Sequence, residues 1–581
     1  MTTTIYTILE EFRKTATSTR DLGDKFERLI LQYLQTDPIY KERFSKVWLW
    51  MDFPKRGNLP DTGIDLVAEE RDTGEYCAIQ CKFYEYTHTL EKSDIDSFFT
   101  ASGTKLFSHR IIIATNYKWS IHAENALKNQ QIPVTRITLY DLANSPVDWS
   151  EFSLEKKTLK LKPKKSIRPH QIKALEAVIN GFKESDRGKL IMACGTGKTF
   201  TSLKIAEQIT NQITNNEKSV SKRSRTIILF LVPSISLLSQ TLREWTAETE
   251  INFHSIAVCS DAKVGTRKTK NNDDNADITV NDLAFPPTTN AQNIINNYQA
   301  SGQNLTVIFS TYQSIQAISD AQKKGLPEFD LIICDEAHRT TGITISGEDE
   351  SYFTKVHNQD FIQGKKRLYM TATPKIFSDD SKVQAQENDA LLCSMDDESL
   401  YGKEFHRLGF GEAVADGLLS DYKVMVLAVD EKYVSATFQR QLADADNELN
   451  LEDAVKITGC WNGLSKRMKT EEGIEDDTHP MKRAVAFSRS IKDSKKIVDL
   501  FSKIVNQYRK LNPDDDTLLH CELDHVDGTQ NALERTNKLE WLKADTSNDG
   551  NICRILSNAR CLSEGVDVPA LDAVMFLSPR N

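Results

Sequence analysis

Short apolar runs recur along the chain from about residue 190 onward and alternate with segments whose apolar residues follow helical spacing. The first series is KLIMACG, TIILFLVPS, LTVIFST, FDLIICDE and KRLYMTATP, and the second is YKVMVLAVD, MKRAVAFSRS, ICRILSNA and DAVMFLSP. Strands that are apolar almost throughout, with helices between them, are typical of a parallel sheet covered on both faces. The pattern therefore predicts two α/β lobes, which we place at residues 168–400 and 401–581.

The pattern before these lobes is different. Helical spacing in LGDKFERLILQYL stands beside strand-like runs in CAIQCKF and RIIIAT, which predicts one compact α/β domain over residues 1–155. A lysine-rich stretch, EKKTLKLKPKKSIRPHQ, follows, and its prolines mark a connector that we place at residues 156–167. We interpret this connector as a solvated linker; a strap that contacts DNA is the alternative.

The length of 581 residues fits roughly three or four domains of about 150 residues each. A composition of 39% hydrophobic and 27% charged residues is that of a soluble globular protein. The segment MTTTIYTILEEFRK lacks the basic start and apolar core of a signal peptide, and no apolar run approaches the roughly 20 residues of a spanning helix. We therefore expect a cytoplasmic protein.

Cysteine spacing and net charge exclude few classes of function. The ten cysteines form no C-x-x-C pair and several lie in apolar runs, which indicates buried thiols in a reducing compartment rather than disulfides or zinc ligands. The net charge of -10 argues mildly against a nucleic-acid partner. Net charge does not report where charges lie, however, and a DNA motor needs only a local basic groove.

The segment MACGTGKT follows a predicted strand and precedes a predicted helix. Gly195, Thr196 and Gly197 form a loop whose backbone N–H groups can surround phosphates at a helix N-terminus. Lys198 is placed to reach the β and γ phosphates, and Thr199 to hold Mg²⁺. Methionine replaces the first glycine of the general pattern, but the strand-loop-helix context supports a phosphate-binding loop.

A second motif, DEAH, ends the apolar run LIIC. Asp335 is placed to bind the Mg²⁺ ion, and Glu336 to orient or deprotonate the attacking water of phosphoryl transfer. The alternative is a chance acidic match at a strand end. The phosphate loop upstream and the segment TATP downstream favour an ATPase.

The ordered motifs RPHQ, MACGTGKT, VPSISLLSQT, FSTYQS, DEAH, TATP, AVAFSRS and ARCLSEGVDVP resemble those of superfamily 2 helicases and translocases. The resemblance covers residues 168–581. It implies that Gln171 contacts adenine and that Thr371 and Thr373 couple hydrolysis to movement. It also implies that Gly565 and Asp567 face nucleotide and nucleic acid between two RecA-like lobes.

The sequence does not include the last motif of that family. The family pattern ends with a Q-x-x-G-R-x-x-R stretch that supplies an arginine finger, whereas this sequence ends at VMFLSPRN. Without such an arginine, charge on the γ-phosphate is poorly neutralised in the transition state. We therefore expect an incomplete second lobe, a fragment of a longer polypeptide or a truncated product, and reduced ATPase activity.

The segment GIDLVAEERDTGEYCAIQCKFY in the first domain carries a second candidate site. Alternation along a strand places Gln80 and Lys82 on one face and the neighbouring apolar residues on the other. Asp65, at the start of the preceding strand, can meet that pair across a hairpin. Asp65 and Gln80 would hold Mg²⁺ while Lys82 steadies the nucleophile or developing charge, although a purely structural hairpin is the alternative.

This arrangement resembles the PD-(D/E)xK nucleases, specifically the Mrr-like branch, in which glutamine occupies the second acidic position. The resemblance covers residues 20–145 and implies that Glu27 assists metal binding. Taken together, the nuclease and helicase motifs of this chain resemble those of the N-terminal half of the type ISP single-polypeptide restriction-modification enzymes. That likeness implies an α/β chain with a restriction-endonuclease-like domain and two RecA-like lobes, which uses ATP and Mg²⁺ to translocate on double-stranded DNA and cut it.

In that family a methyltransferase and a target-recognition module follow the motor and use S-adenosylmethionine. We find no methyltransferase motif here, so we expect those modules further along a longer polypeptide or in separate subunits. Two alternatives remain open: a stand-alone nuclease-helicase of phage defence or DNA repair, and a DNA-binding regulatory module with an inactive nuclease fold.

Overall fold

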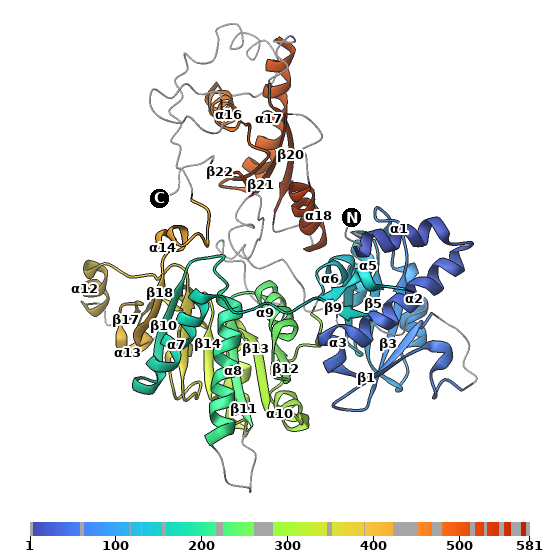
Figure 1. Ribbon diagram of the computed structural model, residues 1–581, viewed down its shortest axis with the longest axis horizontal. Coiled ribbons are helices and arrows are strands. Elements are labelled where there is room, and N and C mark those ends of the chain that lie inside the picture. Colours follow the sequence, from blue (N-terminus) through green and yellow to red (C-terminus); the bar gives the residue numbers. More distant parts are fainter. Residues whose placement is uncertain are drawn as a thin grey trace. The chain divides into compact units, whose positions relative to one another are not determined.

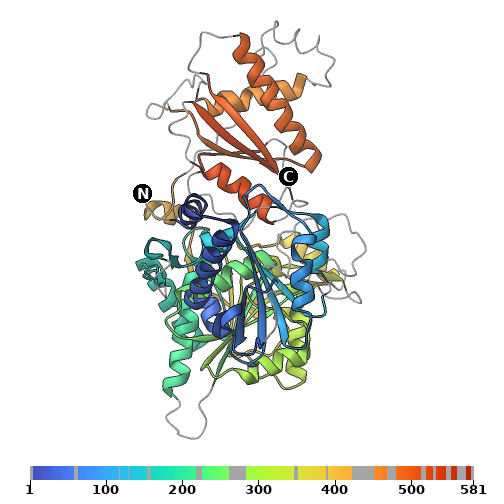
Figure 2. The same cartoon turned by 90° about the vertical axis from the view of Figure 1, so that its right-hand side faces the viewer.

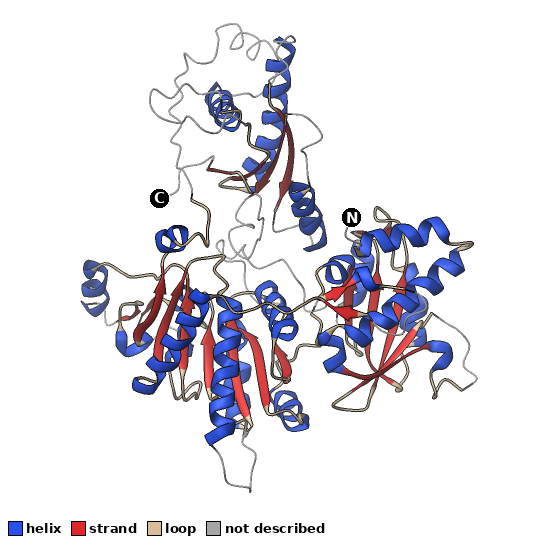
Figure 3. Cartoon of the chain, viewed as in Figure 1, coloured by secondary structure: helices blue, strands red, loops and turns tan. Residues whose placement is uncertain are grey.

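The computed structural model describes residues 4–57, 63–116, 118–128, 130–153, 159–216, 225–260, 283–345, 351–387, 390–421, 451–466, 479–511, 518–527, 532–544, 551–558 and 571–576. The chain divides into two compact units. The described residues up to Asp421 form the first unit, and those from Leu451 onward form the second. Figure 1 traces both, and Figure 3 shows that sheets flanked by helices recur in each.

The N-terminal domain of the first unit is built on a five-stranded sheet with the order β1-β2-β3-β5-β7. Its strands are β1 (Phe44–Leu49), β2 (Leu66–Glu70), β3 (Tyr76–Lys82), β5 (Phe107–Ala114) and β7 (Val134–Thr138). The first three strands pair antiparallel, whereas β3, β5 and β7 pair parallel. This mixed sheet confirms the predicted α/β domain.

Helices bury both faces of that sheet. One face carries α1 (Ile5–Thr15), α2 (Thr19–Thr36), α3 (Pro38–Arg43) and α6 (Leu139–Ala143), and the other carries α4 (Ser93–Ala101) and α5 (Ile121–Leu127). Leu66 and Ile79 pack into the first core, and Val67 and Ala78 into the second. Two short pairs complete the domain: β4 (Thr89–Leu90) with β6 (Lys118–Trp119), and β8 (Val147–Asp148) with β9 (Lys160–Leu161). A polar side chain on either face of the central strands is therefore enclosed by protein.

The rest of the first unit is a lobe around a seven-stranded sheet with the order β12-β13-β11-β14-β16-β10-β18. Every pairing in it is parallel. The strands are β10 (Arg187–Met192), β11 (Thr226–Val232), β12 (Phe253–Val258), β13 (Leu305–Thr311), β14 (Leu331–Cys334), β16 (Arg367–Thr371) and β18 (Lys403–Leu408). All residues of β11 and β13 are buried, as the continuous apolar runs predicted.

Two layers of helices cover this sheet. On one face lie α7 (Pro169–Glu184), α8 (Lys198–Asn216) and α9 (Ile235–Glu248), and on the other α10 (Ala291–Ala300) and α11 (Ile315–Lys323). The remaining elements are β15 (Gly342–Ile345), which pairs with β17 (Ala390–Cys393), and the helices α12 (Asp379–Glu387), α13 (Glu398–Tyr401) and α14 (Phe410–Ala415). The predicted parallel sheet with helices on both faces is confirmed.

The boundary predicted between residues 400 and 401 differs from the structure. Strand β18 follows that point and pairs with β10 inside the sheet of the first lobe. Gly402, with φ of +71°, turns the chain into β18, and a Cβ atom there would collide with the carbonyl group of Arg187. The first lobe therefore continues through α14 to Asp421.

The second unit contains a four-stranded parallel sheet with the order β20-β21-β19-β22. Its strands are β19 (Arg483–Phe487), β20 (His520–Val526), β21 (Ile552–Asn558) and β22 (Ala573–Phe576), and its helices are α16 (Leu451–Leu464), α17 (Ile491–Leu511) and α18 (Ala532–Lys543). Helices α16 and α17 pack on one face, and Leu542 of α18 packs on the other. Figure 2 gives a second view of these elements in orange and red.

The cysteines that the structure describes are all free thiols. Most are buried, as predicted, but Cys194 of the phosphate loop is exposed. Across the described ranges, no helix combines the length and apolarity that a membrane crossing requires.

Candidate active sites

The loop between β10 and α8 has the backbone shape that phosphate binding requires. Gly195 and Gly197 have φ values of +81° and +85°, in the left-handed region that favours glycine. A Cβ atom at Gly197 would also collide with the side-chain amide of Gln171. Helix α8 begins at Lys198, directly after the loop, so its first N–H groups, which lack partners within a helix, border the same space. The loop can cradle a polyphosphate.

Gln171 and His170 are buried against this loop. The Gln171 side chain accepts a hydrogen bond from the backbone N–H of Arg168 at 2.9 Å and donates to the carbonyl oxygens of Thr196 and Gly197, each at 3.4 Å. Nε2 of His170 lies 2.9 Å from the same Thr196 carbonyl oxygen. Adenine recognition by Gln171 stays a prediction, and the structure places its side chain next to the phosphate loop.

Asp335 lies directly after β14 and is buried. Its carbonyl oxygen accepts a hydrogen bond from the hydroxyl of Tyr312 at 2.8 Å. Burial and then the Glu336 carboxylate raise the pKa of Asp335 to about 7, while the Lys198 ammonium opposes the rise. The charge of Lys198 therefore acts on the acidic pair, as expected for an ATP site that spans the loop and the DEAH segment.

Glu336 has a φ of +48°, which is uncommon outside glycine and holds the residue in a strained turn. Burial would raise the pKa of Glu336, but the hydrogen bond with His338 and the charge of Lys198 together lower it. Glu336 is thus kept ionised, which suits a group that accepts a proton from water or orients it.

His338 connects this carboxylate to the next strand. Its Nδ1 atom lies 3.3 Å from Oε2 of Glu336 and 3.0 Å from Oγ1 of Thr371, which ends β16. The backbone N–H of Thr373 donates to the same Thr371 hydroxyl oxygen at 3.1 Å. The two threonines predicted to couple hydrolysis to movement therefore contact the DEAH segment through His338.

In the N-terminal domain the hairpin brings Asp65 to β3. The Asp65 N–H donates to the carbonyl oxygen of Ile79 at 2.9 Å, and Oδ2 of Asp65 accepts from the N–H of Cys81 at 2.6 Å. Nε2 of Gln80 donates to the carbonyl oxygen of Gly63 at 3.0 Å. Asp65 is therefore held against the β3 backbone on either side of Gln80, and a joint site of the two side chains stays a prediction.

Gln80 is 2% exposed, and its Oε1 atom has no hydrogen-bond partner within the described part of the chain. A buried amide oxygen without a donor carries a cost of about 1–3 kcal/mol, which coordination of a cation would remove. The described residues hold no group of three or more His, Cys, Asp or Glu side chains placed for a metal ion. A Mg²⁺ site at Asp65, Gln80 and Glu27 stays a prediction, in which the amide oxygen of Gln80 would be one of the oxygen ligands.

Glu27 on α2 and Lys82 at the end of β3 belong to the same neighbourhood. Burial raises the pKa of the Cys81 thiol, the Asp65 and Glu27 carboxylates raise it further, and the Lys82 ammonium lowers it. Of the four predicted nuclease residues, Asp65, Glu27 and Lys82 thus lie close enough to Cys81 to act on its charge, and Gln80 precedes Cys81 on β3; their joining in one site stays a prediction. Two carboxylates, an amide oxygen and a cation fit Mg²⁺-assisted cleavage of a phosphodiester.

Charged side chains join the N-terminal domain to the first lobe within the first unit. Nη2 of Arg243 on α9 lies 2.8 Å from Oδ1 of Asp141 on α6, and both side chains are largely buried. Nη1 of Arg43 donates to the carbonyl oxygen of Ala284 at 2.9 Å, and the N–H of Ser255 donates to Oε1 of Glu42 at 3.0 Å. The domain that holds Asp65 is thereby fixed to the domain that holds the phosphate loop.

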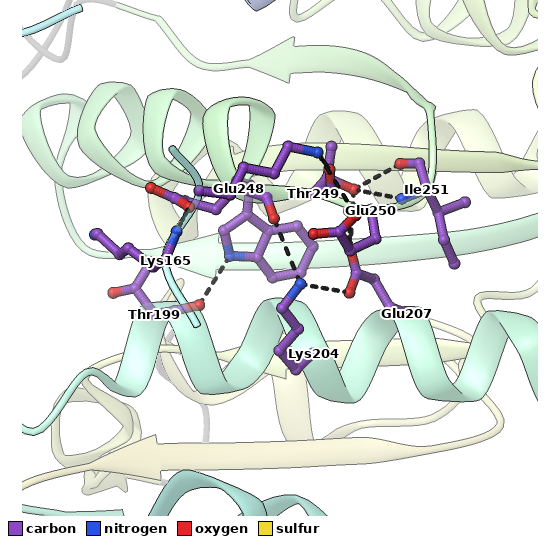
Figure 4. Close-up of polar contacts among 10 residues, drawn as sticks. Lys165, Thr199, Lys204, Glu207, Glu248, Thr249, Glu250 and Ile251 are labelled. Atoms are coloured by element: carbon purple, nitrogen blue, oxygen red, sulfur yellow. Dashed lines mark hydrogen bonds and ion pairs between the residues drawn. The ribbon is translucent and has the colours of Figure 1, made fainter. Parts of the chain in front are cut away.

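The lysine-rich connector adds a further attachment. Lys165 donates through its N–H to Oε2 of Glu248 at 2.6 Å and through Nζ to Oε1 of Glu244 at 3.0 Å, and Nζ of Lys164 donates to the carbonyl oxygen of Thr249 at 2.5 Å. Figure 4 shows Lys165 beside Glu248 at the end of α9. Residues 160–166 of the connector are exposed to solvent and bound along α9, whereas Leu159 is buried in the core of the N-terminal domain. Contact with DNA stays a prediction.

Three predicted or missed groups remain. Gly565 and Asp567 lie outside the described residues. The sequence reasoning gave no role to His170 and His338, although both stand inside the quoted motifs RPHQ and DEAH. No local signal marked Trp245, which contacts the phosphate-loop helix from α9.

Comparisons with known proteins match the same two parts of the chain. Residues 35–159 match a family model described as "Restriction endonuclease", of the Mrr catalytic type, and residues 164–376 match one described as "Type III restriction enzyme, res subunit". Over 411 residues the chain is 26% identical to the "Probable helicase A859L" of African swine fever virus (isolate Pig/Kenya/KEN-50/1950), covering 70% of this chain and 37% of the viral protein. It is 23% identical over 467 residues to the "Type I restriction enzyme EcoAI endonuclease subunit" of Escherichia coli, covering 76% of this chain and 44% of that subunit.

A solved structure, the "ATP-dependent Type ISP restriction-modification enzyme LlaBIII bound to DNA", matches with a TM-score of 0.81 and 40% sequence identity. The match covers 99% of this chain and 35% of that enzyme. The chain thus spans little more than a third of the length of the viral helicase and of the type ISP enzyme.

Proposed function

This chain has the Mrr-type nuclease domain and helicase-like ATPase domain of the type ISP restriction enzymes that it resembles, and from that premise we propose that it is the nuclease-motor part of an ATP-dependent DNA restriction enzyme. The observation that carries the proposal is the pair of sites in the first unit, one around Gln80 and one around the phosphate loop. They occur in a chain that matches a DNA-bound type ISP enzyme along 99% of its length.

In the motor, ATP is the substrate. The phosphate loop holds the triphosphate through backbone N–H groups, and Lys198 neutralises its outer charge. Thr199 and Asp335 would hold Mg²⁺, which supplies further charge neutralisation at the phosphates. Glu336, kept ionised by His338 and Lys198, orients the attacking water and accepts its proton. Thr371 is adjacent through His338, so a change at Glu336 reaches β16.

In the nuclease, the substrate is a DNA phosphodiester. Asp65, Gln80 and Glu27 would hold Mg²⁺, which activates water and polarises the phosphate when bound. Lys82 stabilises the negative charge that develops on the phosphate oxygens. Gln80 is fixed for this role because its amide nitrogen is already bound to the carbonyl oxygen of Gly63.

Choice of a DNA site belongs to other modules in this proposal. The chain covers 35% of the type ISP enzyme that it matches, which leaves room for methyltransferase and target-recognition modules in a longer polypeptide or in separate subunits. S-adenosylmethionine would enter with those modules. Restriction of invading DNA, as in phage defence, is the biological role that fits this combination.

Two substitutions test the proposal on the purified chain. Lys198→Ala is expected to abolish DNA-stimulated ATP hydrolysis and leave the nuclease domain folded, whereas Asp65→Asn is expected to abolish Mg²⁺-dependent nicking of a plasmid and leave ATP hydrolysis intact. Nicking that survives Asp65→Asn at the original rate would mean that the nuclease site assigned around Asp65 is wrong. ATP hydrolysis that survives Lys198→Ala would contradict the motor.

A further inference from the structure

Helix α9 contacts the phosphate-loop helix α8 at the residue expected to hold Mg²⁺. Nε1 of Trp245 donates a hydrogen bond to the backbone carbonyl oxygen of Thr199 at 3.1 Å. Thr199 is the second residue of α8, directly after Lys198. The only other side chain of the described residues that is seen to donate to this carbonyl oxygen is Ser202, whose hydroxyl lies 2.7 Å away within α8 itself. Trp245 therefore ties the first turn of α8 to a separate helix.

The Trp245 indole ring is fixed in place by its packing, so it can hold a hydrogen-bond partner in one position. Trp245 is fully buried and packs edge-on against Phe230, Phe253 and Phe309 of three strands, with ring centroids 5.1, 6.3 and 5.7 Å away. A Trp ring fixed by three aromatic neighbours has little freedom to follow a movement of α8. The packing against the sheet therefore sets the position of the indole N–H, and the carbonyl oxygen of Thr199 is held where this N–H can donate to it.

The end of α9 is clamped to α8 further along. Nζ of Lys204 donates to the carbonyl oxygen of Glu248 at 3.4 Å and lies 2.9 Å from Oε2 of Glu207. Oε1 of Glu207 in turn accepts from Oγ1 of Thr249 at 3.1 Å and from the N–H of Glu250 at 2.5 Å. Figure 4 shows these contacts between the two helices. Because the clamp fixes the spacing of α8 and α9, the Trp245 bond can set the orientation of the first turn of α8.

We propose that Trp245 is a positioning residue for the Mg²⁺-binding end of α8: its N–H holds the backbone of Thr199 so that the Thr199 hydroxyl points at the metal of the ATP site. The inference rests on the proposed ATPase function. It assigns Trp245 no contact with nucleotide. Trp245 acts through Thr199, so its loss should weaken the contribution of Mg²⁺ to nucleotide binding more than it weakens binding of the nucleotide alone.

The test is Trp245→Phe, which keeps most of the ring packing and removes the N–H. Binding of ADP is measured by calorimetry with Mg²⁺ and with EDTA, and the ratio of the two affinities is compared with that of the unmodified chain. We expect the Mg²⁺-dependent gain in affinity to fall roughly threefold to tenfold, the factor carried by one hydrogen bond of ordinary net strength. The KM for Mg²⁺·ATP should rise by a similar factor.

Trp149→Phe is the matched control, because Nε1 of buried Trp149 donates to the carbonyl oxygen of Leu142 at 3.0 Å in the N-terminal domain, away from the ATP site. It removes the same kind of bond and should leave the Mg²⁺-dependent gain unchanged. If Trp245→Phe lowers the melting temperature enough to compromise binding, replacement of Trp245 by 3-benzothienylalanine removes the N–H with the bicyclic shape retained.

An unchanged Mg²⁺-dependent gain in either Trp245 variant would overturn the inference, as would an equal loss in the Trp149 control. Failure of the proposed function is distinguishable from both outcomes, because in that case the unmodified chain itself would bind no nucleotide.

Discussion

Nδ1 of His338 lies 3.0 Å from the hydroxyl oxygen of Thr371, so the DEAH segment after β14 is joined to the end of β16 by a side-chain contact. The same imidazole nitrogen lies 3.3 Å from the Glu336 carboxylate. A single nitrogen thus faces both the Glu336 carboxylate and the hydroxyl of Thr371, the first residue of the TATP segment. In the proposed motor, this contact would connect hydrolysis to Thr371 and Thr373, the threonines that the sequence predicts to couple it to movement.

Loss of that contact should separate hydrolysis from movement. Thr371→Val keeps the shape of the buried side chain and removes the hydroxyl that contacts His338 and Thr373. We expect nucleotide binding to persist and DNA-stimulated ATP hydrolysis to fall roughly threefold to tenfold, with a larger loss of triplex displacement per ATP hydrolysed. Thr341→Val, on a half-buried threonine whose hydroxyl donates to the carbonyl oxygen of His338, is the comparison, and it should spare the displacement-to-hydrolysis ratio.

Lys82→Ala should disable cutting without affecting the motor. Removal of a cation that stabilises a developing oxyanion costs on the order of 100-fold or more in rate. We expect plasmid nicking in Mg²⁺ to fall by about that factor, with ATP hydrolysis unchanged. Glu75→Gln, at an exposed position just before the same strand, serves as the control and should nick normally. Equal nicking rates for the Lys82 and Glu75 variants would show that Lys82 takes no part in the nuclease site.

Thiol modification offers a probe of the phosphate loop. Cys194 is exposed while the other described cysteines are buried or half-buried, so N-ethylmaleimide should react there first. A maleimide adduct beside Gly195 would obstruct the triphosphate, and ATP hydrolysis should be lost in proportion to labelling. ATP should protect, and Cys194→Ala should retain activity after treatment. Inhibition that persists in Cys194→Ala would assign the effect to another thiol.

The Glu42 carboxyl at the junction with the first lobe should make stability depend on pH. Burial raises its pKa to about 8 from an ordinary 4.5, with the hydrogen bond from the Ser255 N–H opposing the rise and the Asp72 carboxylate adding to it. Between these values the unfolded chain releases a proton that the folded chain retains, so stability falls as pH rises from about 4.5 towards 8. Below pH 4.5 both states hold the proton and the effect disappears.

Glu42→Gln removes this titration and keeps an oxygen for the Ser255 N–H. Its melting temperature should exceed that of the unmodified chain at pH 8, by roughly 2–4 °C for each kcal/mol recovered, and approach it at pH 5. Glu91→Gln, at an exposed position, should show no such pH-dependent difference. A difference in melting temperature between Glu42→Gln and the unmodified chain that stays constant from pH 5 to pH 8 would contradict a buried, protonated Glu42.

The strands that the sequence patterns did not reveal are mainly edge strands. Strands β12, β18 and β20 all lie at the edge of a sheet, with one neighbouring strand each. An edge strand is half open to solvent or to a neighbouring domain and tolerates polar residues, such as His254 and Ser255 in β12 or Glu522 and Asp524 in β20. The apolar runs that identify central strands are absent from them, so the first lobe was predicted to end one strand early.

The contacts in the candidate sites were also predictable only where they are local in sequence. Asp65 and Gln80 belong to one hairpin, and the sequence was enough to predict that they lie on neighbouring strands. The phosphate loop and DEAH segment are local motifs at strand ends. The Trp245 bond to Thr199 joins residues 46 positions apart through the packing of two helices, and no periodicity encodes it. Likewise the Arg243 bond to Asp141 spans 102 positions.

The anchored connector limits how far the N-terminal domain can move from the first lobe. Leu159 is packed in the core of the N-terminal domain, and Lys164 is already bound to the end of α9. Five residues of extended chain reach at most roughly 17 Å. If the chain acts as proposed, the nuclease domain stays within a short distance of the motor, and breaks in DNA should fall within a narrow window at a set distance from where the motor halts.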